Sequence, residues 1–207
     1  MESEETQPRE IRARIDDYFR TLSELAQTVS VTTAKGSALT FDEGVETIIK
    51  AAFETHASGR KLMWIGNGGS AAIASHMAID YSKNGGIRST AFNDASLLTC
   101  LSNDLGYEFI FEKSIEMLAQ PGDLLIAISS SGCSSNILRG VAAARAADCG
   151  IVTLSGFDLD NPLRRLGDLN FYVPSKEYGF VEITHLTICH AILDLSGSLT
   201  LTSGAGR

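Results

Sequence analysis

The chain has 207 residues, enough to bury one sizeable hydrophobic core, and its 44% hydrophobic and 20% charged residues are typical of an ordinary globular protein. The formal net charge of -8 disfavours nucleic acid as a partner, because phosphate backbones are held chiefly by Lys and Arg. No apolar run reaches the ~18 residues of a membrane-spanning helix and the N-terminus is polar, so we expect a cytoplasmic protein that does not bind membranes.

The first sixty residues carry two helical patterns. Over residues 10–29 apolar side chains recur at helical spacing and form one stripe, which must be buried somewhere. The segment TTAKGSA, residues 32–38, breaks this pattern, and Thr40 with Glu43 forms the T-x-x-E signature of a capped helix start. We therefore predict an N-terminal helical hairpin over residues 1–57.

Beyond residue 60, short apolar runs alternate with helical stretches. Near-continuous apolar strands that alternate with helices predict a parallel sheet covered on both faces, here with about five strands. This domain is expected over residues 58–200, with a frayed tail at 201–207. The expected strands are 62–66, 87–92, 124–129, 150–156 and 170–175, and the expected helices are 70–82, 136–149 and 181–195.

The loop GNGGS follows the first of these strands and opens a helix. Residues 66–71 fit the dinucleotide fingerprint G-x-G-x-x-A, but Asp94, the acidic residue that would contact the ribose, comes later than usual. A P-loop is excluded because the lysine of GK[ST] is missing. A tight turn would explain the glycines, but it would leave the next helix unexplained.

That next helix carries His76 and Asp80, which are four residues apart and therefore lie on one face. Such a pair is more often a local polar contact than a metal site. Its place about two turns below a ligand-binding edge of the sheet raises the case for a metal.

A second loop, SSSGCSS, also joins a strand to a helix. Backbone N–H groups at a helix N-terminus carry about half a positive charge and bind phosphate without any lysine. One serine would suffice to cap the helix, so five hydroxyls favour an anion cradle over capping alone. These hydroxyls belong to Ser129, Ser130, Ser131, Ser134 and Ser135. Neither loop matches the G-x-S-x-G of serine nucleophiles.

The last expected helix carries Glu182, His185 and His190. The two histidines lie on different faces of a helix, so we predict that one of them is structural. Glu182 and His190 are about 12 Å apart along a regular helix, too far to bind one metal ion. If both serve one site, either Glu182 lies outside the regular helix or the two residues come from different subunits.

Together these segments resemble the sugar isomerase (SIS) domain family and, within it, the phosphoheptose isomerases. The motifs that carry the resemblance are GNGGSAA followed by a histidine and a carboxylate, LSNDLGYE, PGDLLIAISSSGCSSN and EITHLTICH. The resemblance covers nearly the whole chain. It implies a doubly wound, flavodoxin-like three-layer α/β/α sandwich, assembled as a homotetramer with active sites at subunit interfaces and with the N-terminal helices helping to build the assembly.

The resemblance also implies an aldose–ketose isomerase that acts on sedoheptulose 7-phosphate through an enediol. The serine loop would hold the phosphate, Asp80 would act as base, His190 as acid, and a zinc ion would be bound between the first and last helices. The implied substrate-binding residues are Asn67, Gly68, Gly69, Ser70, Asp80, Asn103, Asp104, Ser129, Ser130, Ser131, Ser134 and Glu182, and the implied zinc ligands are His76, Asp80, Glu182 and His190.

Three positions depart from the family pattern. Asp80 stands where the family has glutamate, Glu182 where it has glutamine, and Ile73 where it has aspartate. Asp and Glu both bind zinc, so metal binding survives, whereas the shorter Asp80 side chain alters the catalytic geometry. Two alternatives stay open: an isomerase of another sugar phosphate, and an SIS protein that binds sugar phosphates or protein partners without catalysis.

Overall fold

The computed structural model describes the backbone of residues 3–203 and the side chains of residues 10–196. Its centre is a sheet with the strand order β2-β1-β7-β6-β5-β3-β4. The five strands from β3 to β7 are parallel to one another and overlap the five predicted segments, which confirms the predicted sheet. They are β3 (Leu62–Ile65), β4 (Ser89–Ala91), β5 (Leu124–Ser129), β6 (Gly150–Ser155) and β7 (Leu169–Tyr172).

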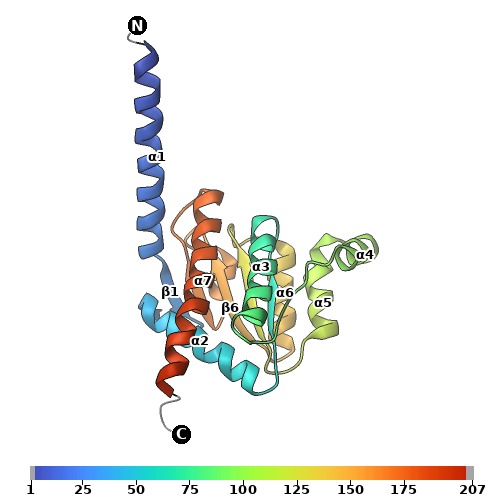
Figure 1. Cartoon of the computed structure of the whole chain (residues 1–207). Coiled ribbons are helices and arrows are strands. Elements are labelled where there is room, and N and C mark those ends of the chain that lie inside the picture. Colours follow the sequence, from blue (N-terminus) through green and yellow to red (C-terminus); the bar gives the residue numbers. More distant parts are fainter. Residues whose placement is uncertain (1–2, 204–207) are drawn as a thin grey trace.

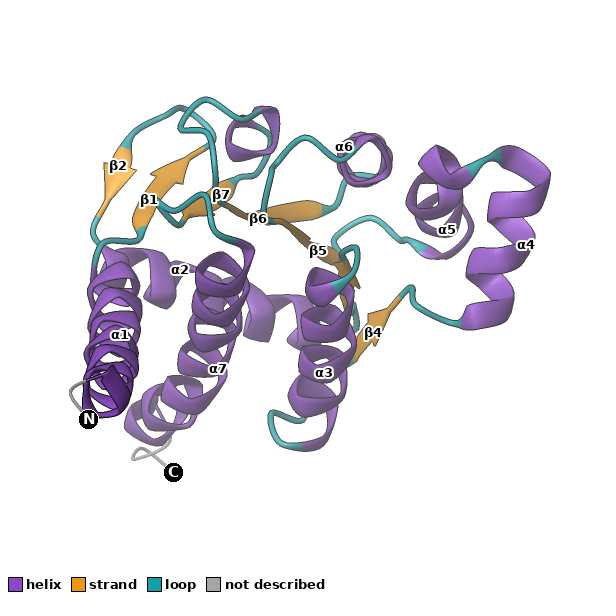
Figure 2. Ribbon diagram, turned by 90° about the horizontal axis from the view of Figure 1, so that it is seen from above, coloured by secondary structure: helices purple, strands orange, loops and turns teal. Residues whose placement is uncertain are grey.

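Helices cover both faces of this sheet (Figure 2). One face is covered by α2 (Phe41–Ala57), α3 (Gly69–Lys83) and α7 (Tyr178–Ser203), and α1 (Ser3–Gln27) packs on α7. The other face is covered by α5 (Ile110–Leu118) and α6 (Ser135–Ala146), and α4 (Ala95–Leu105) packs on α5. Two short 3-10 helices, η1 (Tyr107–Phe109) and η2 (Pro162–Arg165), complete the chain order. The three-layer α/β/α sandwich is therefore confirmed.

The central strand β5 shows why the sheet needs cover on both sides. Successive side chains of a strand point to opposite faces. Leu124, Ile126 and Ile128 enter the core beneath α2, α3 and α7, whereas Leu125 and Ala127 enter the core beneath α5 and α6. All residues of this strand are buried. The near-continuous apolar run thus supplies two hydrophobic cores at once.

The predicted break at residues 32–38 is in fact part of a β-hairpin. β1 (Ser30–Thr33) pairs antiparallel with β2 (Ala38–Leu39) and with β7, where Val31 faces Phe171. Val31 is buried, and β-branched residues suit a pleated, half-buried edge. The sheet consequently has two more strands than the five expected, and β1 runs antiparallel to both of its neighbours, β2 and β7.

The predicted boundary at residue 57 does not separate two cores. α2 begins with the predicted capping box, in which Glu43 N–H donates to the Thr40 hydroxyl and Thr40 N–H donates to the Glu43 carboxylate. Its apolar face then packs into the same core as the sheet, because α2 covers one face of the sheet that β1 extends. The residues buried in this way are Val45, Ile48, Ile49 and Ala52.

By contrast, α1 extends beyond the body of the molecule (Figure 1). Only its C-terminal part contacts α7, so the N-terminal part of the predicted apolar stripe is uncovered in a single chain. Ile11, Ile15 and Phe19 are 55%, 50% and 64% exposed. Covering this stripe requires a surface that one chain does not provide.

The C-terminal helix is longer than predicted. α7 runs to Ser203, so the expected frayed tail at 201–207 is helical in its first three residues, and residues 204–207 lie outside the described part. Within residues 3–203, no helix combines the length and apolarity required to cross a bilayer.

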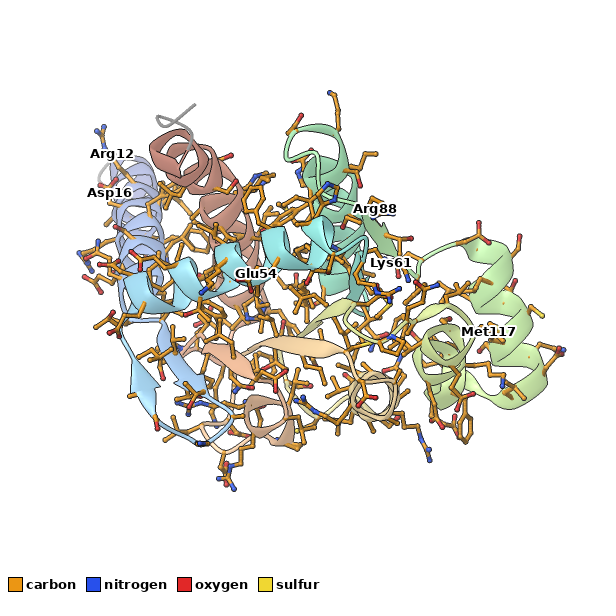
Figure 3. The ribbon with its side chains drawn as sticks, turned by 90° about the horizontal axis from the view of Figure 1, so that it is seen from below. Arg12, Asp16, Glu54, Lys61, Arg88 and Met117 are labelled. Atoms are coloured by element: carbon orange, nitrogen blue, oxygen red, sulfur yellow. The ribbon has the colours of Figure 1, made fainter. Side chains whose placement is uncertain are left out.

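The amino-terminal edge of the parallel strands is fixed by an ion pair, and Figure 3 views this side from below. Lys61 Nζ lies 2.5 Å from Asp123 Oδ2, and the buried Asp123 carboxylate also accepts from the Lys61 and Gln120 N–H groups. This contact joins the starts of β3 and β5. The opposite, carboxyl ends of these strands carry the two loops of interest.

Candidate active site

The two loops meet at the carboxyl ends of β3 and β5, which are neighbours in the sheet. They line a pocket of about 240 Å³, together with the first turn of α7. The pocket is lined by Asn67, Gly68, Gly69, Ser70, Ile128, Ser129, Ser130, Ser131, Ser134, Tyr178 and Glu182. Most of the predicted substrate-binding residues are therefore brought together.

The glycine-rich loop can form only with glycine at particular positions. Gly68 has φ +54°, a conformation that side chains rarely adopt, and a Cβ at Gly66 would collide with the backbone of Ser70. The turn starts α3 at Gly69, directly beside the pocket. The tight turn and the ligand site are thus one feature.

The serine loop leaves hydroxyls facing the pocket instead of capping α6. Ser134 precedes α6, but its side chain makes no capping hydrogen bond and lies 3.4 Å from the Ser129 hydroxyl. The Ser130 hydroxyl is buried and has no hydrogen-bond partner within the described residues. Buried polar groups are normally paired, so a ligand oxygen is the partner that this arrangement fits. The predicted anion cradle explains the loop better than capping does.

Asn161, which the sequence analysis missed, holds the serine loop in place. Its side-chain N–H groups donate to the carbonyls of Gly156 and Asp158, and its oxygen accepts from Arg164 N–H. A Cβ at Gly132 would collide with this side chain. The Asn-Pro dipeptide signals a turn, but nothing in the sequence links it to a loop thirty residues earlier.

A second cluster lies farther along the same pair of helices. His76 on α3 and His190 on α7 approach to 3.3 Å between their Nε2 atoms, and Asp80 Oδ2 lies 3.4 Å from His76 Nε2. One ligand atom from each residue falls within 4.8 Å of the others. Two atoms bound at ~2.0 Å to one tetrahedral Zn²⁺ are about 3.3 Å apart, so the donor types and the two separations from His76 Nε2 fit a zinc ion.

Glu182 does not join this cluster within one chain. It lies in the first turns of α7, where its carboxylate packs against Gly69 so closely that a Cβ there would collide with it. One chain therefore brings together three of the four predicted zinc ligands, since eight residues of regular helix separate Glu182 from His190. Because Glu182 lies inside the helix, it can join this cluster only if it comes from another subunit.

The two histidines of α7 differ as predicted. His185 is fully buried, and its Nε2 lies 3.1 Å from the Ser155 carbonyl oxygen at the end of β6. Burial lowers the pKa of His185 to about 4, so the ring is neutral near pH 7. His185 is the structural residue, and His190 faces the cluster.

Comparison with known proteins decides the family. The profile of the SIS domain matches residues 17–156. The chain belongs to the SIS domain family. Its relatives include the phosphoheptose isomerase of Aliarcobacter butzleri, 36% identical over 162 residues that cover 75% of this chain and 85% of that protein, and that of Geobacter sulfurreducens, 38% identical over 145 residues that cover 67% and 76%. The SIS match begins at residue 17, inside the predicted N-terminal hairpin. This start agrees with the packing of α2 and the sheet into one core.

Solved structures support the same SIS fold. The phosphoheptose isomerase GmhA of Neisseria gonorrhoeae aligns with a TM-score of 0.78 at 27% identity, over 91% of this chain and 99% of that one. The Vibrio vulnificus NanR protein complexed with ManNAc-6P aligns with a TM-score of 0.57 at 19% identity over 78% of this chain and 55% of that one, which shows the fold alone.

Asp94, the acidic residue that a dinucleotide site would need, has a different role in this structure. The Asp94 carboxylate caps α4 by accepting from Leu97 N–H at 3.0 Å. It is therefore engaged in starting a helix. The glycine-rich loop serves the pocket instead.

Two predicted substrate-binding residues lie away from the pocket. Asn103 and Asp104 are on α4, bonded to each other through the Asn103 amide and the Asp104 carboxylate. α4 has no buried residues and stands at the edge of the molecule, far from α3 and α7 (Figure 1). In one chain these two residues do not reach the serine loop.

Proposed function

We propose that the protein is an aldose–ketose isomerase that converts D-sedoheptulose 7-phosphate into D-glycero-D-manno-heptose 7-phosphate for heptose biosynthesis. The observation that carries this proposal is the relationship to phosphoheptose isomerases, which at 36% identity spans 85% of the Aliarcobacter butzleri protein. The pocket and the His–Asp cluster supply a chemical basis for it.

The phosphate of the substrate would lie in the serine loop. The N-terminus of α6 directs N–H groups and a partial positive charge toward the pocket, and the lining contains neither Lys nor Arg. The unpaired Ser130 hydroxyl provides a further donor. This arrangement binds an anion despite the acidic charge of the whole chain.

The reacting end of the sugar would lie at the His–Asp cluster. α3 and α7 run side by side in the same direction, since Gly69 meets Glu182 and His76 meets His190 about two turns later. A ligand anchored by its phosphate at the serine loop can therefore extend along these helices. Such a separation suits a long sugar chain better than a short one.

Isomerisation needs a base, an acid and stabilisation of negative charge. Asp80 would remove a proton from C1, while His190 donates one to the carbonyl oxygen at C2, which gives the enediol. Return of a proton to C2 and loss of the O1 proton complete the aldose. His76, Asp80 and His190 would hold Zn²⁺, which when bound supplies Lewis-acid stabilisation of charge on the sugar oxygens.

We further propose that the site is completed in a homotetramer. The exposed stripe of α1 and the unburied α4 are surfaces that a second copy can cover. Asn103 and Asp104 would then contribute to the site of a neighbouring chain. Light scattering of the purified protein checks the assembly, and a monomeric, active enzyme would contradict it.

A cytoplasmic location belongs to the same proposal. All four cysteines are free thiols, and disulfides are rare in the reducing cytoplasm. The net negative charge of the chain disfavours nucleic acid as a partner. The proposed phosphate site at the N-terminus of α6 suits a small sugar phosphate instead.

Incubation with sedoheptulose 7-phosphate tests the proposal. We expect NMR to show an aldose heptose phosphate accumulating to equilibrium. Activity on a different ketose phosphate alone would favour the alternative of another sugar. Binding without turnover of any ketose phosphate would favour a non-catalytic SIS regulator, which has no use for the zinc-spaced cluster.

A further inference from the structure

A side-chain network behind the pocket fixes the orientation of Asn136. The Asn136 side-chain oxygen accepts from the backbone N–H of Ile137 at 3.0 Å. A backbone N–H can only donate, so this contact determines which end of the amide is oxygen. The NH₂ group of Asn136 must consequently point the other way, toward Asn67.

The hydrogen bonds to Asn136 fix the orientation of the Asn67 amide. The two amides form a reciprocal pair, with both N–O distances at 2.9 Å. The Tyr107 hydroxyl donates to the same Asn67 oxygen at 2.9 Å. Both lone pairs of that oxygen are therefore occupied, and one of the two N–H groups of the Asn67 amide is bonded.

One N–H group of Asn67 thus remains, and Asn67 lines the pocket. We propose that Tyr107 and Asn136 are positioning residues that lock Asn67 as a hydrogen-bond donor to an oxygen at the phosphate end of the ligand. Asn67 can then bind a phosphate or neighbouring ether oxygen, but it cannot accept from a sugar hydroxyl. This inference rests on the proposed function for its substrate.

The location favours the phosphate end over the reacting carbons. Asn136 is the second residue of α6, whose N-terminus forms the anion cradle, so its partner Asn67 lies beside that cradle. The His–Asp cluster is about two helical turns away. We expect this contact to bind substrate and transition state alike, and loss of such uniform binding raises KM while kcat stays nearly unchanged.

Substitutions at Asn67 test the donor assignment. Asn67→Ala removes the donor, and we expect KM for sedoheptulose 7-phosphate to rise about tenfold. Asn67→Asp keeps the shape but presents only acceptors, so KM should rise further, by about a hundredfold. The opposite order, with the aspartate variant binding better than the alanine variant, would mean that Asn67 accepts a hydroxyl and would overturn the proposal.

Tyr107→Phe tests the positioning role, because it removes one hydroxyl and no pocket surface. We expect KM to rise about threefold to fivefold at nearly constant kcat. Asn84→Asp, at the exposed end of α3, is the control and should retain wild-type constants. Unchanged constants in Tyr107→Phe, or a loss confined to kcat, would contradict the assignment.

A ligand-free measurement separates this proposal from the isomerase assignment. In ¹⁵N NMR spectra, one side-chain N–H of Asn67 should exchange slowly with water and the other rapidly, and Tyr107→Phe should accelerate exchange of the slow one. Equal, fast exchange of both protons in the wild-type protein would overturn the locked amide. Failure of the wild-type protein to isomerise sedoheptulose 7-phosphate would refute the proposed function without altering this exchange result.

Discussion

The serine-loop pocket and the His–Asp cluster lie on the same two helices but are built differently. The pocket is formed by loops at strand ends, and its shape depends on buried contacts such as that of Asn161 with Gly132. The cluster is formed by side chains on helix surfaces, and the His76 side chain is 50% exposed. A single chain thus presents a loop pocket, the proposed phosphate anchor, and a partly exposed cluster, the proposed reactive end.

This contrast suits different roles for the two sites in substrate recognition. A buried, glycine-dependent loop binds one chemical group in one position, which suits a phosphate common to many substrates. An open cluster can be completed by another subunit and adjusted by single substitutions such as Asp80 for glutamate. Substrate identity should therefore depend on the cluster and its neighbours, and phosphate binding on the pocket.

The largest expected effect separates chemistry from anchoring. Asp80→Asn removes the proposed base but leaves the serine loop intact, so turnover should fall about 100- to 10,000-fold while sedoheptulose 7-phosphate still binds. Kinetics combined with calorimetric titration measure both quantities. Asp42→Asn, on the exposed first turn of α2, is the matched control. Full activity of Asp80→Asn would remove Asp80 from the mechanism.

Metal content distinguishes the three clustered ligands from Glu182. We expect zinc to co-purify with the protein, to be lost from His76→Ala and His190→Ala, and to persist in Glu182→Ala, because Glu182 packs on Gly69 instead of the cluster. Elemental analysis of each purified variant checks this. Loss of zinc from Glu182→Ala would instead place a neighbouring subunit's Glu182 in the metal site.

The scaffold beside the pocket should show its own pH dependence through His185. Its pKa is lowered from 6.5 to about 4 by burial, so between these values the unfolded chain binds more protons than the folded one. The free energy of unfolding therefore has its full value above pH 6.5 and falls by about 3 kcal/mol as the pH drops toward 4.

Urea unfolding at a series of pH values measures this loss. His185→Gln keeps a donor for the Ser155 carbonyl but does not titrate, so its curve should be flatter between pH 6.5 and 4. Parallel curves for the two proteins would assign the acid sensitivity to other groups.

The parts predictable from sequence were those encoded in contiguous segments. The parallel strands were evident because each is a short apolar run, and the serine loop because its hydroxyls and its helix follow one another. β1 and β2 were missed because Thr and Ser at a sheet edge resemble a polar linker, and the pairing of β1 with β7 is a contact across more than a hundred residues.

The arrangement of the site depended on helix packing, which spacing along one helix cannot reveal. The calculated separation of Glu182 and His190 was informative, because it showed that they cannot bind one ion from one regular helix. Which of them joins His76 follows only from the placement of α3 against α7. The packing of Asn161 on Gly132 and the hydrogen bond of Tyr107 to Asn67 were equally invisible, since each joins a side chain to a distant loop.

The smallest expected effect probes the anchor through Ser130. Removing a hydroxyl that has no partner costs the ligand-free protein no hydrogen bond, so Ser130→Ala should keep or slightly raise the free energy of unfolding. The same change should raise KM about tenfold, since a donor to the phosphate is lost.

Ser114→Ala provides the contrasting case. Its buried hydroxyl donates to the Ile110 carbonyl within α5, so that variant should lose about 1 kcal/mol of stability at an unchanged KM. Urea unfolding measures the stability of each variant and steady-state kinetics measure its KM. We expect only KM to worsen in Ser130→Ala and only stability to fall in Ser114→Ala. A Ser130→Ala protein that is destabilised while KM stays constant would show that this hydroxyl supports the fold, and the anchor would then consist of the backbone of the loop and its other serines.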